Sequence, residues 1–184
     1  MKARRLIVLC GLRCSGKTTT GRLLASRLGT PFSDLDEIVA AAEGASAAEI
    51  ITDRGLDAFR EAERRSLERF LATPERRGVL ALGGGAPTHP PLAKLLTNAA
   101  NDGHLVIVYL RAAPVVLAAR LRSPANAGSR PTLTQGASDP SAEVEQLFEE
   151  RDPLYSSLAG LVVETDELGN EAVADRVLAA VNAD

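Results

Sequence analysis

The sequence predicts an α/β protein in which a buried parallel sheet is flanked by helices. Short apolar runs such as residues 6–10 and 105–110 alternate along the chain with longer segments of helical periodicity. This alternation is typical of parallel sheets. The apolar runs are continuous, which favours strands that are buried on both faces. With 184 residues and no internal repeat, the chain is expected to form a single domain, residues 1–184.

The individual elements follow from local signals. Leu23, Leu24 and Leu28 share a helical stripe that Gly29 ends, and Ser46 with Glu49 has the form of a capping box. Phe59 lies on the apolar stripe of a long amphipathic helix with Leu67, Phe70 and Leu71. The predicted strands are 4–10, 30–33, 78–82, 105–110 and 161–163. The predicted helices are 18–28, 35–42, 46–52, 56–71, 87–100 after a short loop, 114–121, 141–158 and 170–181.

The amino-acid composition excludes several classes of protein. The chain is 45% hydrophobic and 24% charged with a net charge of −3, which argues against a broad nucleic-acid surface. No apolar run is long enough to cross a bilayer, so we expect a cytoplasmic protein without membrane contact. We also expect a monomer. Cys10 and Cys14 indicate neither a zinc site nor a disulfide framework. Cys10 is expected to be a small buried hydrophobe, and Cys14 to fill a variable loop position, with a reactive thiol as the alternative.

Residues 11–18, Gly-Leu-Arg-Cys-Ser-Gly-Lys-Thr, match the phosphate-binding loop G-x-x-x-x-G-K-[ST]. The match lies between a predicted strand and a predicted helix, as the motif requires. Gly11 and Gly16 allow backbone N–H groups to surround a phosphate, and the helix N-terminus favours an anion. Lys17 adds charge near the β- and γ-phosphates, and the Thr18 hydroxyl can bind Mg²⁺. ATP is therefore expected on residues of this loop and the helix start, namely Gly11, Arg13, Cys14, Ser15, Gly16, Lys17, Thr18 and Thr19.

Asp34 and Asp36 follow the second predicted strand, where ligands bind in open α/β sheets. On an extended segment this spacing points both carboxylates the same way. One carboxylate could hold Mg²⁺ through water, and the other could orient or deprotonate a substrate hydroxyl. The alternative is a local turn or a helix cap.

Two further groups follow in the chain. Arg60 and Glu63 are spaced to share a helix face, and a surface ion pair is the alternative to a functional role. Gly83, Gly84 and Gly85 end the strand predicted at 78–82, which suggests a backbone lying directly against a ligand; a tight connector is the alternative.

Residues 123–140 lack periodicity and are rich in Pro, Gly, Ser, Ala and Asn. We interpret this stretch, with its flank from about residue 120, as a lid. Arg130 within it could close over a transferred phosphate, and a solvated loop residue is the alternative. Arg151 ends a run rich in glutamate, where a helix-face ion pair is the alternative to a binding role.

Taken together, the motifs resemble those of the shikimate kinases over nearly the whole chain. The pattern comprises the phosphate loop, Asp34-x-Asp36, Phe59-Arg60-x-x-Glu63, Gly83-Gly84-Gly85, Arg130-Pro131 and Arg151-x-Pro153-Leu154-Tyr155, in that order. The resemblance implies a three-layer P-loop kinase fold whose five-stranded parallel sheet has the order 2-3-1-4-5. It also implies ATP-dependent phosphorylation of the 3-hydroxyl of shikimate, in the chorismate route to aromatic amino acids.

The resemblance also implies roles for particular residues. Lys17 and Thr18 would bind ATP and Mg²⁺, and Asp34 would support the metal through water. Asp36 would bind the substrate hydroxyls and is the candidate base. Arg60 and Arg151 would pair with the shikimate carboxylate, and Gly83, Gly84 and Gly85 would line the substrate pocket. The lid residue Arg130 would contact the phosphates, and Arg120 would lie near the adenine.

The sequence departs from the family pattern at three places. Leu56 stands where the family usually has Glu, the segment 123–140 is longer than usual, and no basic residue for adenine is evident in 164–170. Two other functions remain as alternatives. One is a kinase for another small hydroxylated acid, such as a gluconate kinase, and the other is a shikimate-sensing domain without catalysis.

Overall fold

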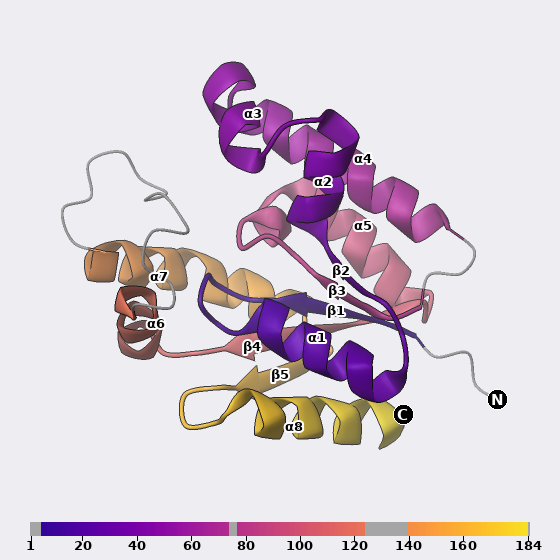
Figure 1. Ribbon diagram of the computed structural model, residues 1–184, viewed down its shortest axis with the longest axis vertical. Coiled ribbons are helices and arrows are strands. Elements are labelled where there is room, and N and C mark those ends of the chain that lie inside the picture. Colours follow the sequence, from indigo (N-terminus) through magenta and orange to yellow (C-terminus); the bar gives the residue numbers. More distant parts are fainter. Residues whose placement is uncertain (1–4, 74–76, 124–139, 184) are drawn as a thin grey trace.

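A computed structural model describes residues 5–73, 77–123 and 140–183 of the protein. Five strands form one parallel sheet in the order β2-β3-β1-β4-β5 (Figure 1), which confirms the predicted fold and strand order. The strands are β1 Leu6–Cys10, β2 Phe32–Asp34, β3 Val79–Ala81, β4 Leu105–Arg111 and β5 Leu161–Glu164. The helices are α1 Lys17–Leu28, α2 Leu35–Glu43, α3 Ala47–Arg54, α4 Leu56–Ala72, the short 3₁₀ turn η1 Ala86–Thr88, α5 Pro90–Asn101, α6 Pro114–Arg122, α7 Pro140–Leu158 and α8 Asn170–Ala183.

The two faces of the sheet bury two separate cores. Successive side chains of a strand point to opposite faces, so Leu6 and Val8 of β1 pack on one side and Ile7 and Leu9 on the other. α1 and α8 cover the face that carries Ile7 and Leu9, whereas α4, α5 and α7 cover the opposite face (Figure 1). Every side chain of β1 is buried, as its continuous apolar sequence predicted.

Most helices and strands begin and end within one or two residues of the predicted positions. The differences have local structural causes. The strand predicted at 30–33 begins only at Phe32, because the amide of Thr30 donates to the carbonyl of Ala25 and completes the end of α1. Gly29 ends α1 in the left-handed conformation, with φ of 61°. Ser46 and Glu49 form the predicted capping box at the start of α3.

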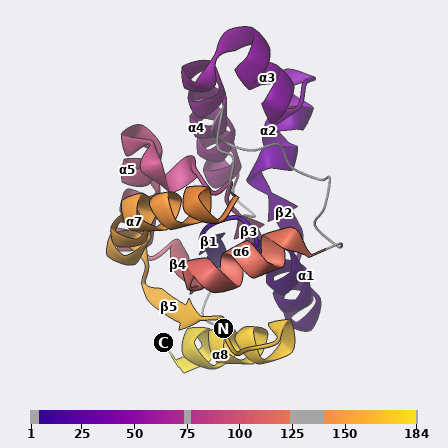
Figure 2. The same cartoon turned by 90° about the vertical axis from the view of Figure 1, so that its left-hand side faces the viewer.

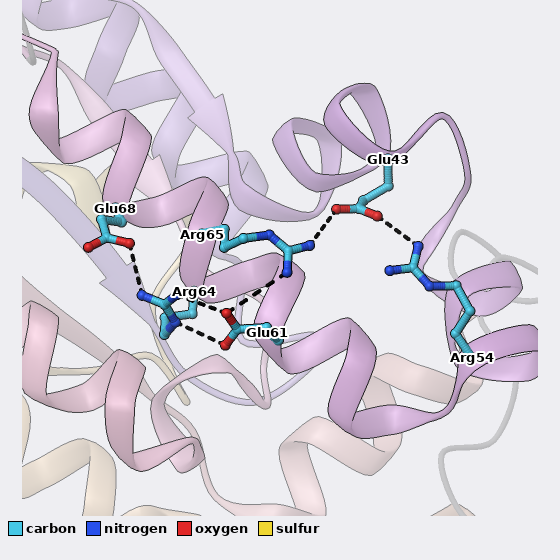
Figure 3. A network of polar contacts seen from close by, with 6 residues as sticks. All are labelled: Glu43, Arg54, Glu61, Arg64, Arg65 and Glu68. Carbon is cyan, nitrogen blue, oxygen red and sulfur yellow. Dashed lines mark hydrogen bonds and ion pairs between the residues drawn. The ribbon is translucent and has the colours of Figure 1, made fainter.

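Helices α2, α3 and α4 form a lobe beyond β2 (Figure 1). Glu43, at the end of α2, accepts hydrogen bonds from Arg54 of α3 at 2.7 Å and from Arg65 of α4 at 2.8 Å (Figure 3). The same network continues along α4 through Glu61, Arg64 and Glu68. The lobe is therefore tied together by charge on its outer surface and by Leu35, Val39 and Ile50 inside.

On the other side of the phosphate loop, α6 and α7 lie side by side (Figure 2). Residues 124–139, which join them and include most of the predicted lid, lie outside the described residues. Residues 120–122, the flank of that predicted lid, are instead the last turn of α6. Among the described residues, no helix combines the length and the apolar character needed to span a membrane.

Candidate active site

The loop from Gly11 to Gly16 joins β1 to α1, as the phosphate-binding motif predicted. Gly11 has φ of 141°, and a methyl group there would lie 2.6 Å from the carbonyl oxygen of Leu110. Gly16 has φ of 96° and immediately precedes the first residue of α1. Both glycines are therefore required by the backbone. The N-terminus of α1 and the loop amides supply the environment that binds phosphate in proteins.

Lys17 lies along this loop. Its Nζ donates to the carbonyl oxygens of Gly11 and Leu12, at 2.9 Å in each case. The half-buried Thr18 follows it in the first turn of α1, and Thr19 is exposed. A cation and a hydroxyl group thus lie together at the helix start, and both groups bind nucleotide phosphates or their metal ion elsewhere.

Arg120 of α6 connects the phosphate loop to the end of β5. Its guanidinium donates to the carbonyl oxygen and the hydroxyl of Thr165, at 2.6 and 3.2 Å, and to the carbonyl oxygen of Cys14 at 3.5 Å. The residue therefore lies beside the loop that is predicted to hold the phosphates.

The two cysteines occupy different environments. Burial raises the pKa of Cys10 to about 12, so this thiol stays protonated at neutral pH and behaves as the small hydrophobe that we expected. Cys14 is half-buried in the phosphate loop and has φ of 63°. A positive φ is strained for a residue with a Cβ atom.

Asp34 and Asp36 do not lie on one extended segment, so the premise of that expectation was wrong. α2 begins at Leu35, and Asp34 is its N-cap, with Oδ1 accepting the amide of Asp36 at 3.0 Å. The alternative of a helix cap therefore holds for Asp34, while Asp36 faces the glycine loop after β3.

Charged side chains converge on the three glycines. A methyl group at Gly83 would lie 2.7 Å from Oδ1 of Asp36 and 3.0 Å from Oε1 of Glu63. At Gly84 it would lie 3.9 Å from Nη1 of Arg151, and at Gly85 it would overlap the guanidinium of Arg60. None of these glycines has a positive φ, so at Gly83 and Gly85 it is the close approach of charged groups that favours glycine, whereas at Gly84 a methyl group would make only ordinary contacts. The loop also makes a tight turn, since the amide of Ala86 donates to the carbonyl of Gly83.

Arg60 and Glu63 form an ion pair, but it is buried and does not lie on a solvated helix face. Nη1 of Arg60 donates to Oε2 of Glu63 at 2.5 Å, and the Glu63 side chain has no exposed area. Burial raises the pKa of Glu63 to about 7, against the opposing effect of Arg60, and the nearby Asp36 carboxylate raises it further. The pair therefore lies against the glycine loop, with Glu63 near Gly83 and Arg60 near Gly85.

Arg151 reaches the same loop from α7. Its Nη1 donates to the carbonyl oxygen of Gly84 at 3.2 Å, and the hydroxyl of Tyr155 donates to the same oxygen. Burial raises the pKa of Tyr155 to about 12, so its hydroxyl keeps its proton for this bond. Arg151 thus contacts the glycine backbone, which differs from the helix-face ion pair considered as an alternative.

The phosphate loop and the glycine loop are neighbours. A methyl group at Gly84 would lie 3.6 Å from the carbonyl oxygen of Gly11 and 3.7 Å from the amide nitrogen of Arg13. The predicted ATP loop thus adjoins the glycine loop, against which lie two cations, Arg60 and Arg151, and two carboxylates, Asp36 and Glu63. This arrangement can hold a small molecule with a carboxylate and several hydroxyls next to a phosphate donor.

Sequence reasoning had missed two of these groups. Glu63 entered as the ion-pair partner of Arg60 and as part of a motif, without a role of its own, although it lies four residues after Phe59 and four before Leu67 on the buried stripe of α4. Tyr155 entered only as part of a motif, because no pattern links a helical tyrosine to a distant carbonyl. Arg130 lies outside the described residues, so its role stays a prediction.

A divalent metal ion would need few protein ligands here. Among the described residues, no group of three or more His, Cys, Asp or Glu could enclose a metal. Mg²⁺ usually keeps several waters and is bound by one or two protein oxygens together with substrate phosphates. Thr18 at the start of α1 and Asp34 at the end of β2 offer such oxygens. Strand β3 lies between β1 and β2, and Asp34 of β2 stands at the same level of the sheet as Leu9 of β1.

Comparison with known proteins gives consistent results. The family model described as shikimate kinase matches residues 13–182. A shikimate kinase from Streptomyces avermitilis is 41% identical over 95% of this chain and 94% of that protein. The solved structure of shikimate kinase from Acinetobacter baumannii in complex with shikimate is similar with a TM-score of 0.84 and 30% identity, covering 99% of this chain and 95% of that one. A gluconokinase from Sinorhizobium meliloti, at 20% identity, TM-score 0.63 and coverage of 98% and 93%, shares the fold.

Proposed function

The chain belongs to the shikimate kinase family, and on this premise we propose that it transfers the γ-phosphate of ATP to the 3-hydroxyl of shikimate. One structural observation supports the proposal in addition to family membership. The charged groups of Asp36, Arg60 and Arg151 meet on the glycine loop next to the phosphate loop. A compact ring with one carboxylate and three hydroxyls matches that set of charges.

The two arginines would bind the shikimate carboxylate, because a guanidinium offers several N–H donors in a plane that matches a carboxylate. Glu63 holds Arg60 in place through their ion pair. Arg151 is held at Gly84 by its own hydrogen bond and lies one helical turn from Tyr155. Binding at two fixed cations would orient the ring so that its 3-hydroxyl faces the phosphate loop.

Asp36 would accept the proton of that hydroxyl. The hydroxyl oxygen forms a bond to the γ-phosphorus while the bond to the β,γ-bridging oxygen breaks, so that shikimate 3-phosphate and ADP result. Lys17 and the loop amides would hold the phosphates, and Arg130 would balance charge on the transferred group. Arg120 would contact the adenine beside Thr165. Positioning and charge account for most of the catalysis in reactions of this type.

Mg²⁺ would be held by the hydroxyl of Thr18 and, through water, by Asp34. When bound, it supplies positive charge that neutralises the phosphate oxygens. We further propose a cytoplasmic monomer built as a single domain whose ligands are ATP and shikimate, without a nucleic-acid or membrane partner.

Product analysis tests the proposal. The protein is incubated with shikimate, ATP and MgCl₂, and the product is examined by phosphorus and proton NMR. The proposal expects phosphate on the 3-hydroxyl, and Asp36→Asn should abolish this product while ATP binding by calorimetry survives. Shikimate binding without turnover by the unsubstituted protein would favour a sensing domain instead.

A further inference from the structure

Asp152, the neighbour of Arg151 on α7, is held by two side chains of β4. The hydroxyl of Tyr109 donates to Oδ1 of Asp152 at 2.8 Å. Arg111 donates to both carboxylate oxygens, from Nε at 2.7 Å and from Nη2 at 3.2 Å. One carboxylate thus accepts three hydrogen bonds from a neighbouring strand, and two of them come from a planar guanidinium that fixes its orientation.

Arg111 is itself restrained on its other sides. Its Nη1 donates to Glu164 at the end of β5, at 3.0 Å, and its guanidinium carbon lies 5.1 Å from the centre of the Phe148 ring. Phe148 and Asp152 are four residues apart on α7 and therefore share a face. Arg111 consequently bridges two strands and one turn of α7, so that this turn cannot rotate without breaking several contacts.

The anchored turn is the one that carries the pocket residues. The ring of Tyr109 packs edge-on against the ring of Tyr155 with centroids 5.1 Å apart. Tyr155 and Arg151 both donate to the carbonyl of Gly84. Pro153 lies in the same turn and lacks an amide hydrogen, so the helix ladder is weaker here by one bond. Contacts between side chains therefore have more influence on the position of Arg151 than they would in an uninterrupted helix.

We propose that Asp152 is a positioning residue for shikimate binding, which acts by fixing the turn of α7 that presents Arg151 at Gly84. The inference rests on the proposed function. A rotation of the helix by one residue would carry Arg151 through about 100°, away from the position in which it would meet the substrate carboxylate. Loss of the anchor is therefore expected to weaken shikimate binding more than the chemical step.

A double-mutant cycle tests this proposal. Michaelis constants are measured for Asp152→Ala, Arg151→Ala and the double variant, with ATP as the second substrate. Asp152→Ala alone should raise the KM for shikimate about tenfold, with a change in kcat of about twofold or less and no change in the KM for ATP. In the Arg151→Ala background the same substitution should have little further effect, because the group that it positions is gone. An equal rise in both backgrounds, or no rise in either, would overturn the proposal.

Two controls separate positioning from general loss of stability. Glu164→Gln removes the other acidic partner of Arg111 but leaves Asp152 in place, and it should leave the KM for shikimate unchanged. Asp152→Asn keeps an acceptor for Tyr109 and should recover part of the affinity. If Asp152→Ala lowered the melting temperature without changing the KM for shikimate, Asp152 would have only a structural role. That result would contradict the inference.

Hydrogen exchange distinguishes failure of this inference from failure of the proposed function. Amides of the second half of α7 should exchange faster in Asp152→Ala than in the unsubstituted protein, whatever the enzyme phosphorylates. Unchanged exchange rates would show that Asp152 does not fix this turn of α7. Faster exchange together with no shikimate turnover by the unsubstituted protein would instead overturn the proposed function.

Discussion

The carboxylate of Glu63 is buried against the guanidinium of Arg60, with 2.5 Å between Oε2 and Nη1. The other carboxylate oxygen, Oε1, faces Gly83 beside Asp36 and has no hydrogen-bond partner among the described residues. One oxygen of the buried Glu63 thus orients Arg60, while the second lies near Gly83 beside the carboxylate of the exposed Asp36. Glu63 is therefore expected to influence both pH dependence and substrate affinity.

The free energy of unfolding should depend on the ionisation of Glu63 between its ordinary pKa of 4.5 and its raised pKa of about 7. In this window the folded protein holds a proton on Glu63 that the unfolded chain has released. The contribution of Glu63 to the free energy of unfolding therefore falls as pH rises, by up to about 1.4 kcal/mol for each unit of pH. Denaturant unfolding of the unsubstituted protein and of Glu63→Gln between pH 4.5 and 8 measures this contribution.

The difference between the two proteins isolates Glu63 from other titrating groups. Glutamine cannot titrate, yet it can still accept a hydrogen bond from Arg60. We expect the unsubstituted protein to lose stability relative to Glu63→Gln as pH rises. Parallel curves over the whole range would show that Glu63 ionises as an ordinary glutamate.

Alanine at Gly85 should damage shikimate binding. Its methyl group would overlap the guanidinium of Arg60, so that side chain must move. We expect Gly85→Ala to raise the KM for shikimate about tenfold or more, since a displaced charge-assisted contact costs on the order of 2 kcal/mol. Gly160→Ala is the matched control, because its methyl group would meet only ordinary contacts at 3.6 Å or more. Equal Michaelis constants for the two variants would be inconsistent with the close approach described here.

Strain at Cys14 predicts that one substitution stabilises the protein. Glycine adopts positive φ without penalty but adds freedom to the unfolded chain, so Cys14→Gly should gain about 0.5–1 kcal/mol. Cys14→Ala keeps the Cβ atom and should show no such gain. Thermal unfolding of the two variants measures the difference, and a lower melting temperature for Cys14→Gly than for Cys14→Ala would contradict the prediction.

Two arginines should differ in the kinetic constant that they control. Arg151→Ala is expected to raise the KM for shikimate by about tenfold or more with a smaller effect on kcat, because it removes a binding contact. Arg130→Ala is expected to lower kcat by about a hundredfold, since it would act on charge that develops during transfer. Steady-state kinetics with each substrate varied distinguishes the two. An unaltered KM in the first variant, or an unaltered kcat in the second, would remove that arginine from the proposed role.

Much of the fold was predictable because its signals are local. The apolar run before Gly11, the glycines of the phosphate loop and the capping box at Ser46 each depend on a few neighbouring residues. Asp34 and Asp36 were treated as parts of one extended segment although the predicted helix already began at residue 35; Asp34 caps α2 and Asp36 belongs to its first turn.

The remaining parts of the site depend on contacts between distant segments. Tyr155 meets Gly84 across 71 positions of sequence, and Asp152 meets Tyr109 across 43. No periodicity in either segment encodes such a meeting. Spacing alone gave the charged lining of the glycine loop only as separate motifs. The family resemblance implied that Asp36, Arg60 and Arg151 share one site, and the fold brings them together at the glycine loop.

The central claim is that this pocket selects shikimate as the phosphate acceptor. Its most direct test is ADP release from MgATP in a coupled assay, with shikimate, quinate, gluconate and nucleoside monophosphates compared at equal concentrations. We expect rapid, saturable ADP release with shikimate and release near background with gluconate and the nucleotides. Turnover of gluconate or of a nucleoside monophosphate without turnover of shikimate would contradict it.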